Sequence, residues 1–508
     1  MKTHTLLLAA AALAGCTVGP NYRPPEMAVP AAFVGPQPPR AAIDPARWWT
    51  TFNDPTLTAL VDRALAGSPD ITIAASRVRQ ARQSEIVARA AGLPTIDASG
   101  NVTHVEFSEN AGLSSIARAF GGGGGAGGGT TNPSNPSGIA LPGSGITTFA
   151  LGFDASWELD LFGGVRRGRE AARARTDAAV WNARDAAVTL SAEVAQAYFA
   201  LRLDQAQVAV VEQELARQRR SLQIAGNIAR VGLVPQLDVT RQRASITATE
   251  ARLEPLRADI DVRRHAIAIL AGDPPATLDE TLRTVPAALP LPASIPAGLP
   301  SDLLRRRPDV RVAERNLAAA TADIGVAVAD LYPRFTLTGA AQLISTALST
   351  LFSGDSLQLT GTGAARFPLL DWGRRRAAVK QREEDRVQAY EAYRATVLGA
   401  LRDVEDGLSR IEAERRRNAP LQRAVIDAEA SARAVSAQYR TGLVTQTPLL
   451  DAETELLTAR ENLAGSDAQL RQMTVSLFKA IGGGWQENDW THPEQSNPLS
   501  QQRPDSKQ

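Results

Sequence analysis

The feature that most constrains the fold is the stretch from Val165 to Val234, which contains no proline and carries an apolar row with a seven-residue repeat. A heptad row of this kind predicts a long coiled-coil helix. At about 1.5 Å per residue, a helix over 165–229 would be on the order of 100 Å long, several times the width of a compact domain. It must therefore stand in a tall helical wall.

The chain carries this pattern twice, the second time 210 residues later. The turn at 230–234 corresponds to 440–444, and Phe162-Gly163 corresponds to Trp372-Gly373. Helices that were alike by chance would not also share a Gly-Leu-Val turn, so the pattern indicates a duplication with a long helical hairpin in each half, over 165–271 and 373–481. The matching rows are Val194, Leu201, Val208, Leu215 and Leu222 with Val404, Ile411, Asn418, Val425 and Ala432, and Val239, Ile246, Leu253, Ile260 and Ile267 with Leu449, Leu456, Leu463, Leu470 and Leu477.

The sequence also predicts two strands before the hairpin in each half. Residues 148–159 alternate between apolar and polar side chains, as does a strand with one apolar face. Strands of about ten residues with this pattern suit the wall of a membrane barrel. Before the strands, Pro69-Asp70 and Pro308-Asp309 begin matching helices at an offset of 239. The expected strands lie near 95–105 and 147–160 and again near 334–344 and 357–369.

The two offsets, 239 and 210, differ because the loop between the first two strands is longer than its counterpart in the second half. This loop contains the glycine-rich run 121–129. This composition predicts a flexible hairpin loop on the cell exterior. A linker between domains is the alternative interpretation. A phosphate-binding loop is not indicated, because the glycines lack the strand before them and the helix after them that such a loop needs.

The N-terminus predicts export and lipid attachment. Residues 1–15 contain one lysine and then an apolar run that is too short to span a membrane as a helix. Small residues precede Cys16, as in the lipobox of bacterial lipoproteins, and Cys16 is the only cysteine, so no disulfide can form within one chain. Acyl chains such as palmitate on Cys16 would anchor the protein to a membrane surface.

Composition argues against enzymatic and nucleic-acid functions. The chain has 55 basic and 54 acidic residues, so we interpret its arginine clusters at 305–307, 374–376 and 415–417 as solvated helix faces. Arg166 and Arg167, like 374–376, follow strands and are candidates for contact with the membrane interface. The four histidines lie far apart and no metal-ligand spacing or nucleophile motif is present, so we expect no catalysis, no metal and no cofactor.

Four strands are too few to close a barrel, and an open sheet edge is not tolerated in lipid, so the chain must oligomerise. The halves 68–272 and 301–484 are joined by a proline-rich segment that should pass around the outside at mid-height. The predicted division is a signal peptide at 1–15, a lipid-anchored tether and mid-level segment at 16–67, repeat half 1 at 68–272, a connecting mid-level segment at 273–300, repeat half 2 at 301–484 and a C-terminal tail at 485–508.

The residues after the lipobox carry a resemblance to a known family. Residues 16–25, with the letters CTVGPNYRPP, and the later Trp48-Trp49 and Phe52-Asn53-Asp54-Pro55 resemble the opening of outer membrane factors of tripartite, RND-type efflux systems. The resemblance is to the lipoprotein, OprM-like/NodT branch of the TolC-like family. It extends from the lipobox to about Gly484 and includes both Gly-Leu-Val turns.

The resemblance implies a mainly α fold with membrane β structure. Three chains would form a trimeric, 12-stranded outer membrane β-barrel, with four strands from each chain, continuous with a long periplasmic α-helical coiled-coil tunnel. The implied function is a passive exit duct for small molecules, embedded in outer membrane lipid. The implied partners are two further copies, a periplasmic adaptor protein and an inner membrane pump.

The hairpin turns are the predicted adaptor-docking tip. Their glycines permit a tight reversal, and the apolar residues beside them are more than a turn requires. The resemblance implies that the adaptor's own hairpin meets this tip, while simple capping of the hairpins is the alternative interpretation. The predicted tip residues are Gly232, Leu233, Val234, Gly442, Leu443 and Val444.

The resemblance also implies a periplasmic aperture at this tip. Asp238 and Asp451 stand where the family places acidic aperture residues, and Tyr439 matches a position that ties neighbouring helices together. The chain departs from the TolC branch at Pro448, where that branch has another aspartate. Alternatively, both aspartates merely favour the first turns of the helices that follow.

Two other functions remain open from the sequence. The same duct could serve type I protein secretion, and the lipobox opening favours efflux only by resemblance. A coiled-coil lipoprotein without a pore is the third hypothesis, and the alternating strands argue against it because a scaffold needs none.

Overall fold

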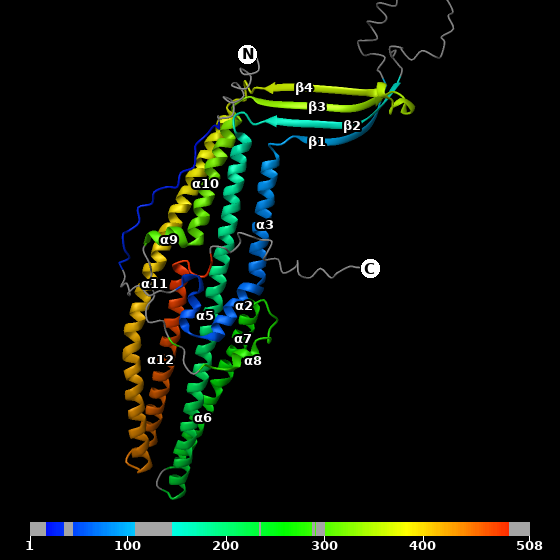
Figure 1. The fold of residues 1–508 in the computed structure, drawn as a ribbon. Helices are drawn as coiled ribbons and strands as arrows, with labels where there is room; N and C mark the ends of the chain where they lie inside the picture. The colour runs from blue at the N-terminus through cyan, green and yellow to red at the C-terminus, as the bar shows by residue number, and fades with distance from the viewer. Residues whose placement is uncertain are drawn as a thin grey trace, which may run out of the picture. The chain divides into compact units, whose positions relative to one another are not determined.

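The computed structural model describes residues 17–34, 44–106, 145–232, 235–286, 290 and 300–486. The chain divides into two compact units (Figure 1). Unit 1 comprises Met1–Asn21, Glu85–Glu170 and Thr321–Glu383. Unit 2 comprises Tyr22–Ser84, Ala171–Ala320 and Glu384–Gln508. The expected signal peptide, Cys16, the glycine-rich run and almost all of the C-terminal tail lie outside the described residues.

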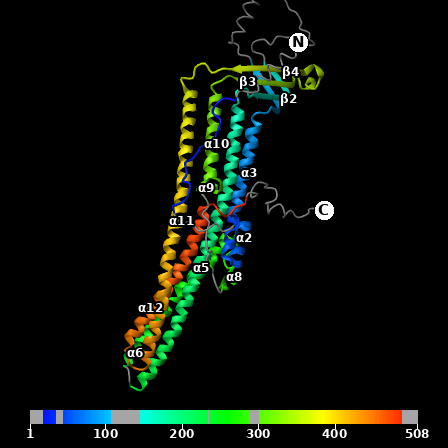
Figure 2. The ribbon, with the colours of Figure 1, turned by 60° about the vertical axis from the view of Figure 1, so that its left-hand side comes forward.

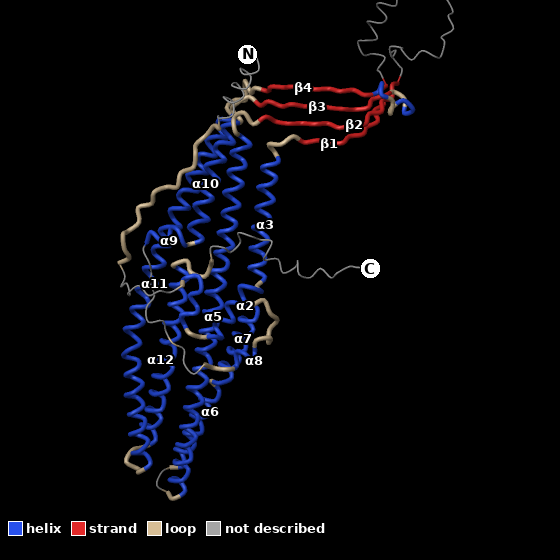
Figure 3. Tube along the Cα trace, viewed as in Figure 1, coloured by secondary structure: helices blue, strands red, loops and turns tan. Residues whose placement is uncertain are grey.

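Unit 1 contains a four-stranded antiparallel sheet in the order β1-β2-β3-β4 (Figure 3). The two inner strands come from different halves of the duplication, and each outer strand has one edge without a partner strand among the described residues. The strands are β1 (Thr95–Glu106), β2 (Gly145–Leu159), β3 (Arg334–Ser345) and β4 (Leu357–Arg366). Two short 3-10 turns, Leu348–Thr350 and Gly354–Ser356, connect β3 to β4.

The expected strands are present with small changes at their ends. The largest change is in β4, which ends at Arg366 rather than at 369. Arg366 is paired with Arg334, the first residue of β3, so the residues after Arg366 have no partner strand beside them in the chain. Pro368 also lacks the N–H that would continue a ladder.

Unit 2 is helical, and the turns of its two long hairpins lie at the same end (Figures 1 and 2). The first hairpin consists of α5 (Gly164–Arg230), α6 (Gln236–Ala251) and α7 (Leu253–Leu270). The second consists of α11 (Arg374–Arg440) and α12 (Gln446–Ala480). Further helices outside the hairpins are α3 (Pro69–Ala90), α8 (Asp279–Arg283), α9 (Pro300–Arg306) and α10 (Pro308–Ala329).

The heptad rows form much of the packing between these helices. Every residue of the row from Val239 to Ile267 is at least nine-tenths buried, and in the row from Leu449 to Leu477 only Leu463 is half-buried. In the first predicted hairpin, over 165–271, the second arm is not one unbroken helix, because α6 ends at Ala251. The cause is Pro255, which has no N–H to donate to the carbonyl of Ala251 and whose ring would clash with it.

The segment 16–67, which was predicted to be a lipid-anchored tether and mid-level segment, contains two helices. They are the 3-10 helix η1 (Pro45–Phe52) and the α-helix α2 (Pro55–Gly67). Asp54 caps α2 by accepting hydrogen bonds from the backbone N–H groups of Thr56, at 2.8 Å, and Leu57, at 3.2 Å. Trp48 is fully buried and stacks on Phe478 with ring centroids 5.2 Å apart, so this segment belongs to the core of unit 2.

The duplication is visible in matching backbone positions. Gly272 and Gly482 follow the two hairpins, and their φ angles are 84° and 74°. A Cβ atom on Gly272 would lie 2.3 Å from the carbonyl oxygen of Gly67, and one on Gly482 would lie 3.1 Å from that of Arg306. Both glycines are therefore required by the same close approach to the chain just before a proline-started helix.

None of the described helices combines the length and the apolar character that a membrane-crossing helix needs.

Candidate functional site

The two hairpin turns in unit 2 have the geometry expected of the predicted tip. Gly232 and Gly442 have φ angles of 78° and 75°, which favour glycine over other residues. In the second turn the N–H of Leu443 donates to the carbonyl of Gln438 at 3.0 Å, which closes the C-terminus of α11. The side chain of Leu443 is 76% exposed, and Val444 is half-buried. Leu233 and Val234 lie outside the described residues.

The predicted aperture residues do not behave alike. Tyr439 is 1% exposed and packs with Ala225, Val239 and Leu449, so it joins the two hairpins through an apolar contact. Its hydroxyl has no hydrogen-bond partner among the described residues. Burial raises the pKa of Tyr439, and the nearby carboxylate of Asp238 raises this pKa further.

Asp238 and Asp451 differ in burial. Asp238 is 8% exposed and lies in the first turn of α6, where its backbone N–H donates to the carbonyl of Pro235 at 3.0 Å. Asp451 is exposed on α12. The structure therefore brings Asp238 close to Tyr439 and leaves the carboxylate of Asp451 in solvent.

A group of buried polar side chains, which we name the polar seam, lies between the two hairpins. All of its members are at least nine-tenths buried, and they come from α5, α6 and α12. Ser221 donates to Glu453 at 2.7 Å, and the side-chain amide of Gln446 donates to that of Gln242 at 3.0 Å. The polar seam consists of Glu214, Gln218, Ser221, Gln242, Gln446 and Glu453.

The polar seam holds two buried carboxylates close together. Burial raises the pKa of Glu453, the hydrogen bond from Ser221 opposes this rise, and the negative charge of Glu214 adds to it. Arg217 is the only cation that affects Glu453 appreciably, and its guanidinium is already paired with Glu214. Glu214 and Glu453 each retain one carboxylate oxygen without a hydrogen-bond partner among the described residues.

Sequence reasoning missed the polar seam, although a signal was present. Gln446 and Glu453 are seven residues apart, as are Glu214 and Ser221. Residues at this spacing lie on one side of a helix. Both pairs run alongside the apolar rows that were predicted to be buried, and this position could have indicated burial for them as well.

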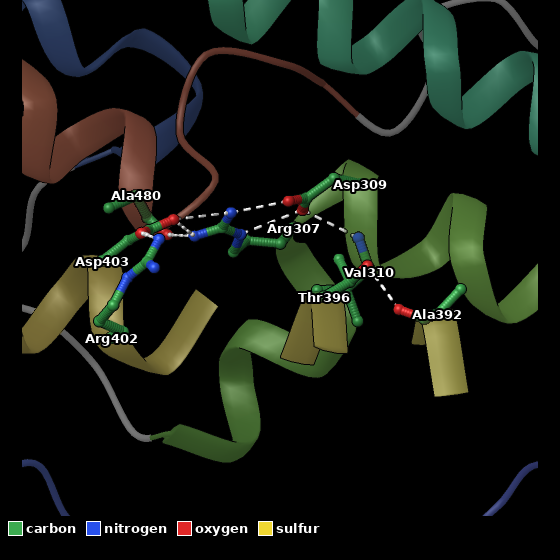
Figure 4. Close-up of polar contacts among 8 residues, drawn as sticks. All are labelled: Arg307, Asp309, Val310, Ala392, Thr396, Arg402, Asp403 and Ala480. Carbon is green, nitrogen blue, oxygen red and sulfur yellow. Dashed lines mark hydrogen bonds and ion pairs between the residues drawn. The ribbon is translucent and has the colours of Figure 1, made fainter. Parts of the chain in front are cut away.

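Arg307 is buried in a network rather than solvated, contrary to the interpretation of the cluster 305–307 (Figure 4). Its side chain is 12% exposed, and its guanidinium lies 2.6 Å from Asp309 and 3.3 Å from Asp403. It also donates to the carbonyl of Ala480 at 3.0 Å. That carbonyl lies at the C-terminus of α12, where helical carbonyls need external donors and where cations are favoured.

Arg307 also lines an open groove of about 1290 Å³ in unit 2, whose lining residues come mainly from α5, α11 and α12. Five basic and three acidic side chains line it. Several of them are ion-paired with one another or with neighbours, as Arg307 is with Asp403 and Arg410 is with Asp406. The groove therefore has a polar wall whose charges largely compensate each other.

Unit 1 exposes apolar side chains on its sheet. Leu151, Phe153 and Trp157 alternate along β2 and are 44%, 61% and 38% exposed. Ile96 and Leu359 on the outer strands are 71% and 72% exposed. An exposed apolar face of this kind needs a non-aqueous environment or a partner surface.

The N-terminal segment of unit 1 lies against the junction of β2 and α5. Thr17 covers Gly163, and the N–H of Val18 donates to the carbonyl of Phe162 at 3.1 Å. Arg167 is 3% exposed and donates to the carbonyls of Val18 and Gly19. The suggestion that Arg167 contacts the membrane interface is therefore wrong, because its guanidinium is used to hold this segment.

No group of three or more His, Cys, Asp or Glu side chains in the described part of the chain is arranged to hold a metal ion.

Comparisons with known proteins all indicate the same class of protein. The outer-membrane channel OprN superposes with a TM-score of 0.81 at 31% identity, over 92% of this chain and 100% of that chain. The MtrE outer membrane channel of Neisseria gonorrhoeae, in its open state, superposes with a TM-score of 0.78 at 26% identity, over 93% and 99%. Nodulation protein T of Rhizobium leguminosarum bv. trifolii is 30% identical over 93% of this chain and 95% of its own length.

The paired helical hairpins and the four-stranded sheet thus define an outer membrane channel. The family model described as outer membrane efflux protein matches residues 60–273 and 299–483. The chain belongs to this family, and the pyoverdine export protein OpmQ of Pseudomonas putida is a further relative at 30% identity over 91% of this chain. The expected membership in the OprM-like/NodT group, the location in the outer membrane and the role as an efflux channel are confirmed.

Proposed function

We propose that the protein acts as a trimer, a passive exit duct that carries small molecules out of the periplasm or cytoplasm and performs no chemistry on them. The observation that carries this proposal is the four-stranded sheet with two free edges and an exposed apolar face. A sheet edge cannot remain unpaired in lipid, so the sheet must close with other copies. Three copies would close it with twelve strands.

The same proposal assigns the hairpin turns to a periplasmic adaptor, which would connect the duct to an inner membrane pump. Val231 and Leu443 are 70% and 76% exposed beside the two glycines. Exposed apolar residues at a helical tip fit a partner hairpin with apolar residues of its own. Cys16 would carry the lipid anchor, since it follows an apolar export segment and small residues that form a lipobox.

Charged substitutions at the turns test adaptor docking. Gly232→Asp and Gly442→Asp place a carboxylate on each tip, and aspartate tolerates a positive φ better than most residues. In a strain that lacks its own outer membrane channel, we expect the double variant to lower drug resistance to the level of that strain while trimers still form on sizing in detergent.

The matched control is the double asparagine variant, because asparagine tolerates a positive φ as aspartate does and carries no charge. It should retain most of the resistance. Full resistance with both aspartates present would place adaptor docking elsewhere on the protein.

Type I protein secretion is the second candidate function. The two functions differ in the pump that binds, so co-purification after mild crosslinking separates them. Recovery of a drug pump of the RND type supports efflux, whereas recovery of an ATP-driven exporter with a protein substrate supports secretion.

A further inference from the structure

The open groove of unit 2 follows α12, with α5 on one side and α11 on the other. The side-chain amide of Gln196 on α5 donates to the hydroxyl of Ser476 on α12 at 3.2 Å. On the other side Gly407 lets α11 approach α12, because a Cβ atom at this position would lie 3.2 Å from Leu477. We name this recess the wall groove, and its lining residues lie within 193–200 of α5, 402–410 of α11 and 469–480 of α12, together with Arg263 and Arg307.

The wall groove opens on the side of α12 that is turned away from the N-terminal helix η1. Trp48 of η1 stacks on Phe478 of α12. Met473 and Gln469, which line the groove, lie five and nine residues before Phe478, so they are rotated about 140° and 180° from it around the helix axis. In the proposed function η1 lies outside the duct, because it belongs to the segment that comes from the lipid anchor. The wall groove then faces the interior of the duct.

The floor of the wall groove is apolar. Ala197, Ala200 and Met473 line it with half-buried side chains. Ala197 and Met473 also pack against the main core of unit 2, which fixes their positions. The thioether of a methionine makes favourable contacts with aromatic rings. A volume of about 1290 Å³ is sufficient for a drug-sized molecule that lies along α12.

The sides of the wall groove carry an excess of positive charge. Five basic and three acidic side chains line it, which leaves two positive charges. At one end, Arg307 and Arg402 share a single carboxylate, that of Asp403 (Figure 4). The side chain of Arg263 is 43% exposed, whereas that of its partner Asp204 is 9% exposed, so a ligand in the groove meets the cation of this pair.

Two exposed cations flank the apolar floor. The side chain of Arg410 is 69% exposed and lies 3.7 Å from Asp406, which is a long distance for an ion pair. Lys479 is exposed on α12. Because α11 and α12 are the antiparallel arms of one hairpin, Arg410 and Lys479 lie in opposite directions from the contact between Gly407 and Leu477. An anion on the floor therefore has a cation toward either end.

We propose that the wall groove is a contact site for transported organic anions that have an aromatic or otherwise apolar body. The apolar body would lie on Ala197, Ala200 and Met473, and the anionic group would meet Arg410 or Lys479. Three copies would provide three such sites at one height of the duct. This inference rests on the proposed function, since it names the class of small molecule that the wall of the duct contacts.

Equilibrium dialysis against purified trimers in lipid nanodiscs tests this site, with empty nanodiscs as the blank. The probe is naphthalene-2-sulfonate, which joins an aromatic body to one negative charge, and its neutral counterpart is naphthalene-2-sulfonamide. We expect the sulfonate to bind once per copy and more tightly than the sulfonamide. Added salt should weaken binding of the sulfonate alone, because salt screens the attraction between exposed charges.

Substitutions of the two exposed cations locate the bound probe. Arg410→Gln and Lys479→Gln should each weaken binding of the sulfonate about two- to fivefold, and the double variant about tenfold. The matched control is Arg416→Gln, which should leave binding unchanged. Arg416 is 75% exposed and pairs with the carboxylate four residues before it on α11, as Arg410 does, but it does not line the wall groove.

Two results would overturn the inference. One is equal binding of the sulfonate and the sulfonamide to the unmodified trimer. The other is binding of the sulfonate that the double variant leaves unchanged. A groove that neighbouring copies cover in the trimer would give the second result, because the probe would then bind elsewhere or not at all.

Transport separates this inference from the proposed function. In a strain that lacks its own outer membrane channel, the unmodified protein should restore resistance to nalidixate, an aromatic anion, and to ethidium, an aromatic cation. The double variant should lower resistance to nalidixate alone. Failure of the unmodified protein to restore resistance to either compound would contradict the proposed function, whereas an equal loss of both resistances in the double variant would contradict the role of the wall groove.

Discussion

At the scale of single residues, the two halves agree at their turn glycines and differ in the burial of their predicted aperture aspartates. Gly232 and Gly442 both adopt a positive φ in an exposed turn. Asp238 and Asp451 were assigned to the same aperture, yet Asp238 is buried beside Tyr439 and Asp451 is exposed. In a trimer both sets would give six carboxylates near the tips of the hairpins, and a narrow opening lined in this way favours cations.

This arrangement predicts a change in conductance when the carboxylates are removed. The purified protein with Asp238→Ala and Asp451→Ala, measured in a planar bilayer, should show higher conductance and a weaker preference for cations. The physical reason is the loss of negative charge and of side-chain volume at the constriction. Each single variant should show part of this effect. Because Asp451 is exposed, Asp451→Ala should change ion preference more than it changes side-chain packing.

Tyr439→Phe is the matched control for the aperture. It keeps the buried ring and removes a hydroxyl that has no partner among the described residues. We expect conductance and ion preference to stay at the values of the unmodified protein. Unchanged values in the double aspartate variant as well would show that the aspartates do not form the constriction; only Asp238 lies in the first turn of its helix, because α12 begins at Gln446.

At the scale of elements, both apolar and polar contacts join the two hairpins. Apolar rows pack along most of the helices, whereas the polar seam lies between α5, α6 and α12. Buried polar groups add less stability than apolar packing of the same volume, and they can fix the register between helices. Glu453 is the member of the polar seam whose ionisation is most directly opposed by burial and by a neighbouring carboxylate.

The polar seam predicts a specific pH dependence of stability. The pKa of Glu453 is raised in the folded protein above its ordinary value of 4.5, because burial and Glu214 disfavour the charged form. The folded state therefore binds this proton more tightly than the unfolded state. Its contribution to stability is fully present below pH 4.5 and is lost as the pH rises through the folded pKa.

Glu453→Gln removes this titration and keeps an oxygen that accepts from Ser221. The thermal midpoint of the variant should exceed that of the unmodified protein at neutral pH, and the difference should shrink toward low pH. The control is Glu455→Gln, because Glu455 is exposed on the same helix. A difference that stays constant with pH would contradict the role given to Glu453.

At the scale of the whole molecule, the described N-terminal segment is fixed to the fold of unit 1. Residues 17–21 are held in unit 1 by Arg167, which donates to two backbone carbonyls and to the side chain of Asn21. Thr17, the first described residue, therefore lies at the strand–helix junction of unit 1.

Mass spectrometry of the mature N-terminal peptide tests the proposed lipid anchor at Cys16. We expect a peptide that begins at Cys16 and carries acyl chains, because the lipobox directs cleavage just before the cysteine. Cys16→Ser should abolish both the modification and the cleavage at this position. An unmodified Cys16, or an intact signal segment on exported protein, would contradict the proposal.

The sequence by itself determined the elements and their duplication. Heptad rows and strict alternation depend on the periods of helix and strand, which are local properties of the backbone, so α5, α11 and the four strands could be predicted within a few residues. Matching glycine turns added the equivalence of the two halves. The family resemblance, carried by the residues after Cys16, supplied the channel function that periodicity alone does not contain.

Only the tertiary structure decided which polar residues are buried and which strands lie at the edges of the sheet. Arg307, Arg167 and Glu453 look like ordinary surface charges in the sequence, because burial depends on what the rest of the chain brings against them. The register at β2–β3 likewise joins residues far apart in the sequence. Backbone geometry repeats locally and can be read from a pattern, whereas desolvation and pairing partners are set by contacts between distant segments.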